Sequence, residues 1–136
     1  LRAAALSSVY QISRILVSNE AELDLMLLAF VDGQHAGNCA FNPVEDSLRV
    51  RHRCAVGIAL YQKFCGMGVG TALLSEILAA AKAAGYERAE LEAVSTNAPA
   101  IGLYKKLGFE VIGTMPQALR YQDGTYADFL LMTKRL

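Results

Sequence analysis

The chain has 136 residues, enough for a single domain with one hydrophobic core. Its 13 basic and 13 acidic side chains balance, which argues against a protein that binds nucleic acid mainly through charge, and its apolar content of 54% excludes intrinsic disorder. No apolar stretch approaches the roughly 20 residues of a membrane span. The three cysteines include no C-x-x-C pair and suggest neither a disulfide framework nor a metal site. We therefore expect a cytoplasmic protein that holds no metal.

The N-terminal third predicts a helix and then a hairpin of two strands. Over residues 1 to about 19, apolar residues recur near every 3.6 positions, as on one face of a helix. Leu25–Val31 has the length and composition of a buried strand, and Asp32-Gly33 is a strong hairpin signal. A return strand is therefore expected over about 35–41.

A long strand is predicted from Leu48 to Tyr61, because three arginines alternate there with other residues. Arg49, Arg51 and Arg53 would then share one face of the strand. We interpret that face as solvated, and the alternative is that one guanidinium holds an acidic substrate.

Two helices with a strand between them follow. Apolar residues from Gly68 to Ala84 recur with a helical period, and Gly85 suits the position just after a helix end. Arg88–Val94 is the next predicted strand. Asn97 is a good N-cap for the second helix, which Gly108 ends.

The C-terminal part predicts another pair of strands. A strand begins over Phe109–Gly113, Asp123-Gly124 marks a hairpin turn, and the return strand runs toward Met132. The predicted order is α-β-β-β-α-β-α-β-β, which indicates one α/β domain of the α+β type over residues 1–136, with a mixed, mainly antiparallel sheet flanked by helices. An exposed edge of such a sheet favours a homodimer.

The stretch CGMGVGTALL, residues 65–74, places three glycines directly before a helix. The first N–H groups of a helix have no partner inside it and carry partial positive charge, so a glycine-rich approach leaves room for an anion. The spacing matches neither the dinucleotide pattern G-x-G-x-x-G nor a Walker loop. A tight turn that binds nothing is the alternative interpretation.

A second stretch, LEAVSTNAPAIGLYKKLGF at residues 91–109, follows at the distance that one helix and one turn require. Together the two stretches resemble the GNAT superfamily of acetyl-coenzyme A-dependent N-acetyltransferases, and the resemblance extends from about Leu25 to the C-terminus. Gly68-Val69-Gly70 match the end of the family's first motif. The residues that match its second motif, an Asn and a helix ending in Tyr-x-x-x-Gly-Phe, are Asn97, Ala100, Tyr104, Gly108 and Phe109.

The resemblance implies that acetyl-CoA binds as a cosubstrate and that a primary amine of a small molecule, amino acid or peptide attacks it directly. Tyr104 would donate a proton to the departing thiolate, whereas a buried core tyrosine is the alternative interpretation. A backbone N–H on the strand before the loop would stabilise the oxyanion. By resemblance, the coenzyme-binding positions are Ile58, Ala59, Leu60, Cys65, Gly66, Met67, Gly68, Val69, Gly70, Thr71, Asn97 and Tyr104.

The sequence departs from the family pattern at two positions and at its start. Cys65 stands where the family has Gln or Arg, and Ala55 stands where many members carry a glutamate base. A bound water would then accept the proton, with His35 and His52 as further candidates. This favours acceptors with an α-amine, because part of that amine is neutral at pH 7. The pattern has no counterpart of the family's first strand and the chain starts without Met, so we expect a piece of a longer protein.

Two other functions are compatible with these departures. A non-catalytic domain could use the same loop to sense coenzyme A or another nucleotide, and a structural domain could pair an open sheet edge with another chain. Cys54 and Cys65 are candidate nucleophiles as well, but direct transfer needs no acyl-enzyme.

Overall fold

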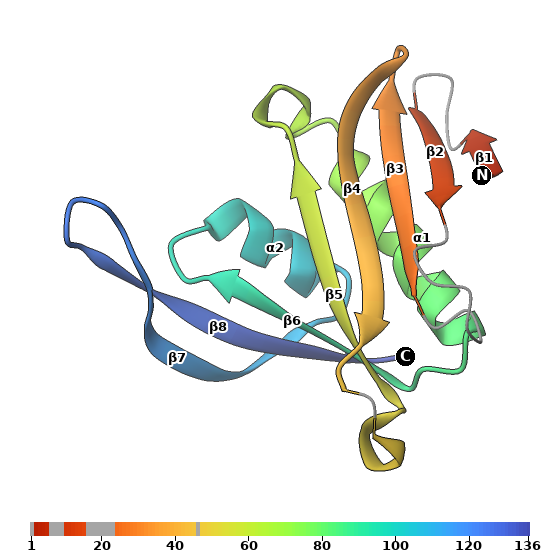
Figure 1. Cartoon of the computed structure of the whole chain (residues 1–136). Coiled ribbons are helices and arrows are strands. Elements are labelled where there is room, and N and C mark those ends of the chain that lie inside the picture. Colours follow the sequence, from red (N-terminus) through yellow and green to blue (C-terminus); the bar gives the residue numbers. More distant parts are fainter. Residues whose placement is uncertain (1, 6–9, 16–23, 46) are drawn as a thin grey trace.

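The structure, a computed structural model, describes residues 2–5, 10–15, 24–45 and 47–136. Within these ranges the chain forms one sheet of eight strands, in the order β1-β2-β3-β4-β5-β6-β8-β7, with two α-helices (Figure 1). All neighbouring strands are antiparallel except β5 and β6. The bounds are β1 (Arg2–Ala5), β2 (Tyr10–Ile15), β3 (Leu25–Val31), β4 (Gln34–Pro43), β5 (Arg53–Leu60), α1 (Val69–Ala83), β6 (Arg88–Val94), α2 (Ala98–Lys106), β7 (Glu110–Arg120) and β8 (Tyr126–Arg135). Neither of these helices has the length and apolar character needed to cross a membrane.

The helix predicted over residues 1 to about 19 is wrong for the part of it that the structure describes. β1 and β2 form an antiparallel pair, and β2 pairs in turn with β3, with Tyr10 opposite Val31 and Ile15 opposite Met26. Two strands therefore precede β3 in the sheet, where the sequence predicted none. Short apolar repeats fit a helix and a strand almost equally well, and pairing with a neighbouring strand decides between them. The remaining positions of the predicted helix lie outside the described residues.

The strand predicted from Leu48 to Tyr61 begins later than expected. Leu48–Val50 forms a single 3₁₀ turn, and β5 starts only at Arg53. Arg49 and Arg51 therefore lie before the strand, and the predicted row of three arginines on one face is wrong. The alternation covered too few residues to exclude a turn.

The other predicted elements are confirmed, with small differences at their ends. β3 and β6 have the predicted bounds, and positive φ angles at Asp32 (49°) and Gly33 (79°) form the hairpin turn between β3 and β4. α1 ends just before Gly85, whose φ of 101° is that of a glycine after a helix end. β7 is longer than predicted, because it continues past Gly113 as far as Arg120.

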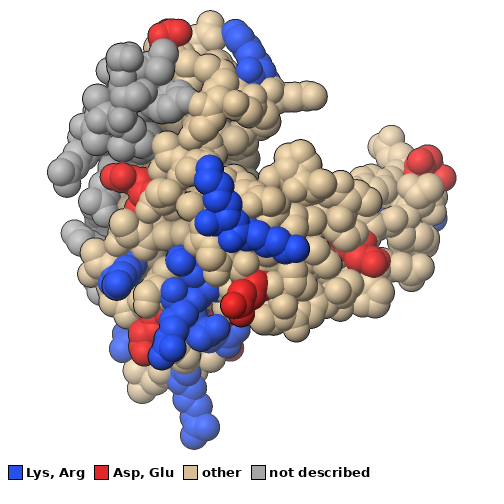
Figure 2. All heavy atoms as spheres, turned by 180° about the vertical axis from the view of Figure 1, so that it is seen from behind, with Lys and Arg blue, Asp and Glu red and all other residues tan. Residues whose placement is uncertain are grey.

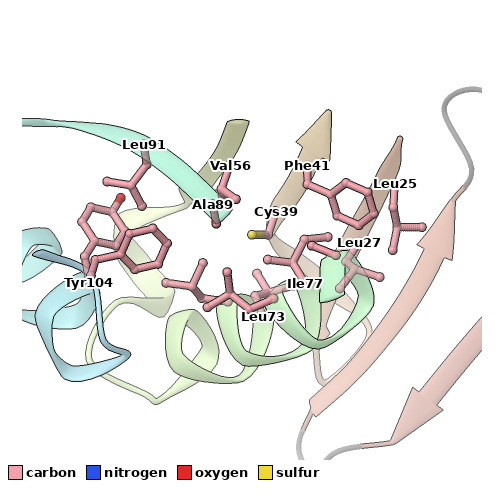
Figure 3. Packing of buried hydrophobic residues seen from close by; sticks show 14 of the residues in the cluster. Leu25, Leu27, Cys39, Phe41, Val56, Leu73, Ile77, Ala89, Leu91 and Tyr104 are labelled. Atoms are coloured by element: carbon pink, nitrogen blue, oxygen red, sulfur yellow. The ribbon is translucent and has the colours of Figure 1, made fainter. Parts of the chain in front are cut away.

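The hydrophobic core lies between α1 and one face of the sheet (Figure 3). Leu73 and Ile77, one helical turn apart on α1, are fully buried, and they face alternate residues of β3 and β4 that include Leu25, Leu27 and Cys39. Burial of each large aliphatic side chain contributes about 1.5–3 kcal/mol. The core therefore fixes α1, and with it the glycine loop, relative to the strands.

The sheet divides between its two parallel strands. β5 and β6 pair at only three positions, the last of which joins Ala55 to Glu90. Beyond this point β5 continues along β4 as far as Leu60, while β6 continues along β8 as far as Val94, and Figure 1 shows the two strands diverging. Seen from behind, the surface is notched between the protruding β7–β8 hairpin and the rest of the molecule (Figure 2). The gap leaves backbone groups of β5 without a partner strand on that side.

Candidate active site

The glycine loop reaches α1 through backbone conformations that other residues rarely adopt. Gly66 and Gly68 have φ angles of 81° and 86°, and Gly68 is the N-cap of α1 without a side-chain cap bond. The N–H of Ala72 donates to the carbonyl of Gly68 at 3.1 Å, so the N–H groups before Ala72 have no partner within the helix. The first turn contains no acidic side chain. This end of α1 is therefore suited to an anion.

Gly70 brings α1 close to β5 and α2. A Cβ atom at this position would lie 3.1 Å from Cδ1 of Leu60 and 3.1 Å from Cδ2 of Leu103, tighter than ordinary van der Waals contact. A side chain here would therefore push Leu60 and Leu103 away by a few tenths of an ångström, and its absence lets the helix start, the strand end and α2 meet closely.

A cavity of about 480 Å³ lies where these three elements meet, and we call it the helix-face cavity. The predicted coenzyme-site residues that line it are Ile58, Leu60, Cys65, Gly66, Gly68, Gly70, Thr71, Asn97 and Tyr104. Three predicted residues do not line it. Val69 is buried in the core, Met67 is exposed, and Ala59 alternates with Ile58 and Leu60 and is exposed on the other side of β5.

Sequence reasoning assigned Asn97 and Tyr104 to the coenzyme site but missed four further residues of α2 that line this cavity. Pro99, Ala100, Leu103 and Lys106 also line it. Lys106 brings a positive charge to a cavity in which Cys65 replaces the family's Gln or Arg. The basic pair at the end of the predicted second helix was the signal that could have identified this residue.

Tyr104 projects from α2 into the helix-face cavity. Its side chain is 8% exposed and packs edge-on against Phe109, with ring centroids 6.1 Å apart. Figure 3 shows the hydroxyl oxygen directed toward the sheet, on the side of Leu91. Burial raises the pKa of Tyr104 above its ordinary value of 10.0. The phenol therefore keeps its proton at neutral pH and is placed to donate it.

Asn97 begins α2 as the sequence predicted. Its side-chain oxygen accepts a hydrogen bond from the N–H of Ala100 at 3.2 Å. The capping role is therefore confirmed, and the same residue also lines the helix-face cavity.

The two cysteines considered as nucleophiles have different surroundings. Cys54 is fully buried, and burial raises its pKa from an ordinary value of 9.0 to about 12, so its reactive thiolate is absent at neutral pH. Cys65 is exposed and its thiol donates to the carbonyl of Tyr61 at 3.7 Å.

The two histidines considered as proton acceptors lie away from the helix-face cavity. The ring of His35, on β4, contacts the Phe30 ring at a tilted angle and the Tyr61 ring edge-on, with centroids 5.7 Å and 5.5 Å apart. His52 lies in the turn before β5, and its backbone carbonyl accepts a hydrogen bond from the N–H of Glu87. Neither histidine lines the cavity.

A second cavity, of about 550 Å³, lies on the opposite side of the dividing strands, and we call it the opposite-face cavity. Arg53 and Ala55 of β5 alternate with buried core residues, as do Glu90 and Glu92 of β6, so these four side chains leave the sheet on the face away from α1. The lining residues are Val44, Arg53, Ala55, Val56, Glu90, Leu91, Glu92, Ile112, Leu131 and Met132.

Two carboxylates thus lie beside the position where the family's glutamate is missing. Glu90 is the direct cross-strand partner of Ala55. Arg53 binds Glu90 through two hydrogen bonds, one of them from Nη2 to Oε1 at 2.7 Å. Glu92, two residues further along β6, lies where the strands have separated. No local pattern in the chain marks these carboxylates, because only strand register brings them beside β5.

The sequence and the fold match known acetyltransferases. Residues 4–109 match the model of the Acetyltransferase (GNAT) family. The chain is 34% identical over 110 residues to the L-amino acid N-acetyltransferase AaaT of Escherichia coli K12, a match that covers 79% of this chain and 66% of AaaT. Its fold is similar to a GNAT-family acetyltransferase of Streptococcus pneumoniae (TM-score 0.79, 30% identity, covering 84% of this chain and 68% of that one). It is also similar to yncA, a putative acetyltransferase from Salmonella typhimurium solved with acetyl-CoA (TM-score 0.77, 26% identity, covering 83% and 65%).

The chain spans about two thirds of the length of these relatives, and slightly less for AaaT and yncA. The family match nonetheless covers most of this chain, including the glycine loop, α2 and the dividing strands. The chain belongs to the GNAT family of acetyltransferases.

Proposed function

We propose that the protein is an acetyl-CoA-dependent N-acetyltransferase that acts on a primary amine of an amino acid, another small molecule or a peptide. The observation that carries the proposal is the division of β5 from β6 beside a cavity that contains both the glycine loop and Tyr104. The similarity to these relatives supports it, since AaaT is an L-amino acid N-acetyltransferase and yncA was solved with acetyl-CoA.

The residues of the helix-face cavity fit the coenzyme. The uncapped start of α1 suits a pyrophosphate, because backbone N–H groups from Gly66 to Thr71 need no particular side chain to bind it. Lys106 adds a cation at the same cavity, and Ile58 and Leu60 offer apolar contacts to the pantetheine chain. Acetyl-CoA supplies a thioester whose acetyl group passes to a nitrogen while the thiol is released.

β5, β6 and α2 each contribute one group to the proposed reaction. A backbone N–H of β5 between Ile58 and Leu60 stabilises the negative charge that develops on the carbonyl oxygen, a role in which such donors contribute about 10²–10³ in rate. Tyr104 gives its proton to the sulfur as the carbon–sulfur bond breaks. The carbon–nitrogen bond forms before this step, by direct attack of the amine on the carbonyl carbon, so the thiol leaves as the carbonyl re-forms and no acyl-enzyme is needed.

Glu92 is our candidate for the group that accepts the amine's proton. Ala55 has no titratable side chain, and Glu90 is neutralised by Arg53. Within the described residues Glu92 has no ion-pair partner, and it lines the opposite-face cavity where the strands have separated. Its carboxylate would take the proton directly or through a water.

The test separates the enzyme from a non-catalytic sensor of coenzyme A. Acetyl-CoA at 100 times its dissociation constant should stabilise the fold by about 2.7 kcal/mol, seen as a rise in Tm. Thiol release should then follow when a panel of amino acids, amino-acid amides, short peptides and polyamines is added. A rise in Tm without thiol release from any amine would favour the sensor, and no rise at all would contradict both.

A homodimer is also part of the proposal. β7 forms one edge of the sheet, and Ile112 and Met115 on it are 65% and 48% exposed. Pairing of two copies would cover apolar surface that an edge strand otherwise presents to water. Sedimentation equilibrium should give twice the chain mass, and a monomer at high concentration would contradict this.

A further inference from the structure

The opposite-face cavity is lined by an arginine, Arg53, that already binds a carboxylate of the protein. Arg53 donates to Glu90 through both Nε and Nη2, which is the two-pronged arrangement by which arginine also binds a carboxylate ligand. The two side chains are 35% and 28% exposed, so the pair lies at the cavity wall within reach of a bound molecule. As long as this pair holds, the edge of the guanidinium formed by Nε and Nη2 is closed to a ligand carboxylate.

The remaining charge of the cavity is negative. Glu92 lines it and has no ion-pair partner among the described residues. One arginine and two glutamates therefore leave one uncompensated negative charge at the cavity wall. That charge attracts an ammonium group and repels an acid.

The rest of the cavity wall is largely apolar. Val44 precedes β5, Leu131 lies on β8 directly opposite Glu92, and Ile112 comes from β7. These side chains suit an aliphatic group attached close to the amine. Their contribution would be lost for an acceptor with no side chain.

We propose that this cavity takes an amine with an aliphatic group beside it and without a free carboxylate on the same carbon, and that Glu90 sets this preference by occupying Arg53. The inference rests on the proposed function and narrows its acceptor class away from free amino acids, the acceptors for which the relative AaaT is named. A small amide or amine and the N-terminus of a peptide share this chemistry, whereas a free amino acid does not.

The experiment compares three acceptors: leucinamide, the tripeptide Leu-Ala-Ala and free leucine. For each, kcat/KM is measured by thiol release at saturating acetyl-CoA. The unmodified protein should prefer leucinamide or the tripeptide to leucine, and the better of these two identifies the source of the amine. The amine of leucinamide loses its proton at lower pH than the amine of leucine, which by itself favours leucinamide. The decisive quantity is therefore how the ratio of kcat/KM for leucinamide to kcat/KM for leucine changes between variants.

The variants test the role of the ion pair. Glu90→Gln and Glu90→Ala should lower the ratio of leucinamide to leucine by about 10-fold or more, since Arg53 is then free to bind the leucine carboxylate. Combining Glu90→Gln with Arg53→Gln should restore the ratio of the unmodified protein. Glu76→Gln, the same change on the exposed side of α1, is the matched control. Circular dichroism checks that each variant is folded.

The possible failures are distinguishable. A ratio that stays unchanged in both Glu90 variants, or an unmodified protein that prefers leucine, would overturn this inference while leaving the acetyltransferase activity in place. No thiol release with any acceptor, together with no rise in Tm on addition of acetyl-CoA, would overturn the proposed function and this inference with it.

Discussion

Tyr104 is part of the hydrophobic core and also lines the helix-face cavity. The ring packs against Phe109 within the motif that ends α2. Burial raises the pKa of the phenol, which keeps its proton available at neutral pH. The core interpretation and the proton-donor interpretation are therefore compatible, and a single substitution can separate them.

Replacing Tyr104 with Phe should keep the packing and remove the proton donor. We expect kcat to fall by on the order of 10², while the dissociation constant of acetyl-CoA and the Tm change little. Steady-state thiol release and calorimetry measure these quantities. Tyr121→Phe, a change at an exposed tyrosine after β7, is the control. An unchanged kcat in Tyr104→Phe would show that the hydroxyl has no part in the reaction.

Glu92→Gln removes the proposed proton acceptor and keeps the size of the side chain. We expect kcat/KM to fall by on the order of 10² at pH 7 and the loss to shrink as the pH approaches the pKa of the acceptor amine, because a neutral amine needs no base. A pH–rate profile measures this. Glu76→Gln serves again as the control. Parallel profiles for the variant and the parent would contradict the assignment.

An added methyl group should have opposite effects on stability in the glycine loop and in α2. Gly68→Ala places a side chain at φ 86°, which costs about 1–2 kcal/mol and is only partly offset by the stiffer unfolded chain. We therefore expect a loss of about 1 kcal/mol in unfolding free energy and weaker binding of acetyl-CoA. Urea unfolding followed by circular dichroism measures the first quantity.

Gly102→Ala is the matched comparison for this change. Gly102 is exposed within α2, and a Cβ atom there would meet nothing within 4 Å. Alanine should therefore stabilise the protein by roughly 0.5–1 kcal/mol. Equal effects of the two substitutions would contradict the importance of the left-handed conformation at Gly68.

Two buried thiols of the core make the stability of the folded protein depend on pH. Burial raises the pKa of Cys39 and of Cys54 from an ordinary value of 9.0 to about 12 in the folded chain. The unfolded chain releases these protons first, so the stabilisation is complete below about pH 9 and is lost as the pH rises toward 12. Each thiol contributes a slope of up to about 1.4 kcal/mol per pH unit.

Cys39→Ala should therefore flatten the decline of unfolding free energy between pH 9 and 11. Urea unfolding under reducing conditions at each pH measures the slope. Cys65→Ala, which removes an exposed thiol, should leave the slope of the parent. A decline that is as steep in Cys39→Ala as in the parent would assign the alkaline instability to other groups, of which Tyr86 is the first candidate because burial raises its pKa to about 12.

The family, the hairpin at Asp32-Gly33, the helix caps and most residues of the helix-face cavity could be predicted from the sequence, because these features depend on residues close together in the chain. The N-terminal strands, the place where β5 begins and the carboxylates beside Ala55 became apparent only from the fold. Each of these depends on pairing between strands that are distant in sequence. A local pattern carries no information about register, and register alone places Glu90 and Glu92 beside β5.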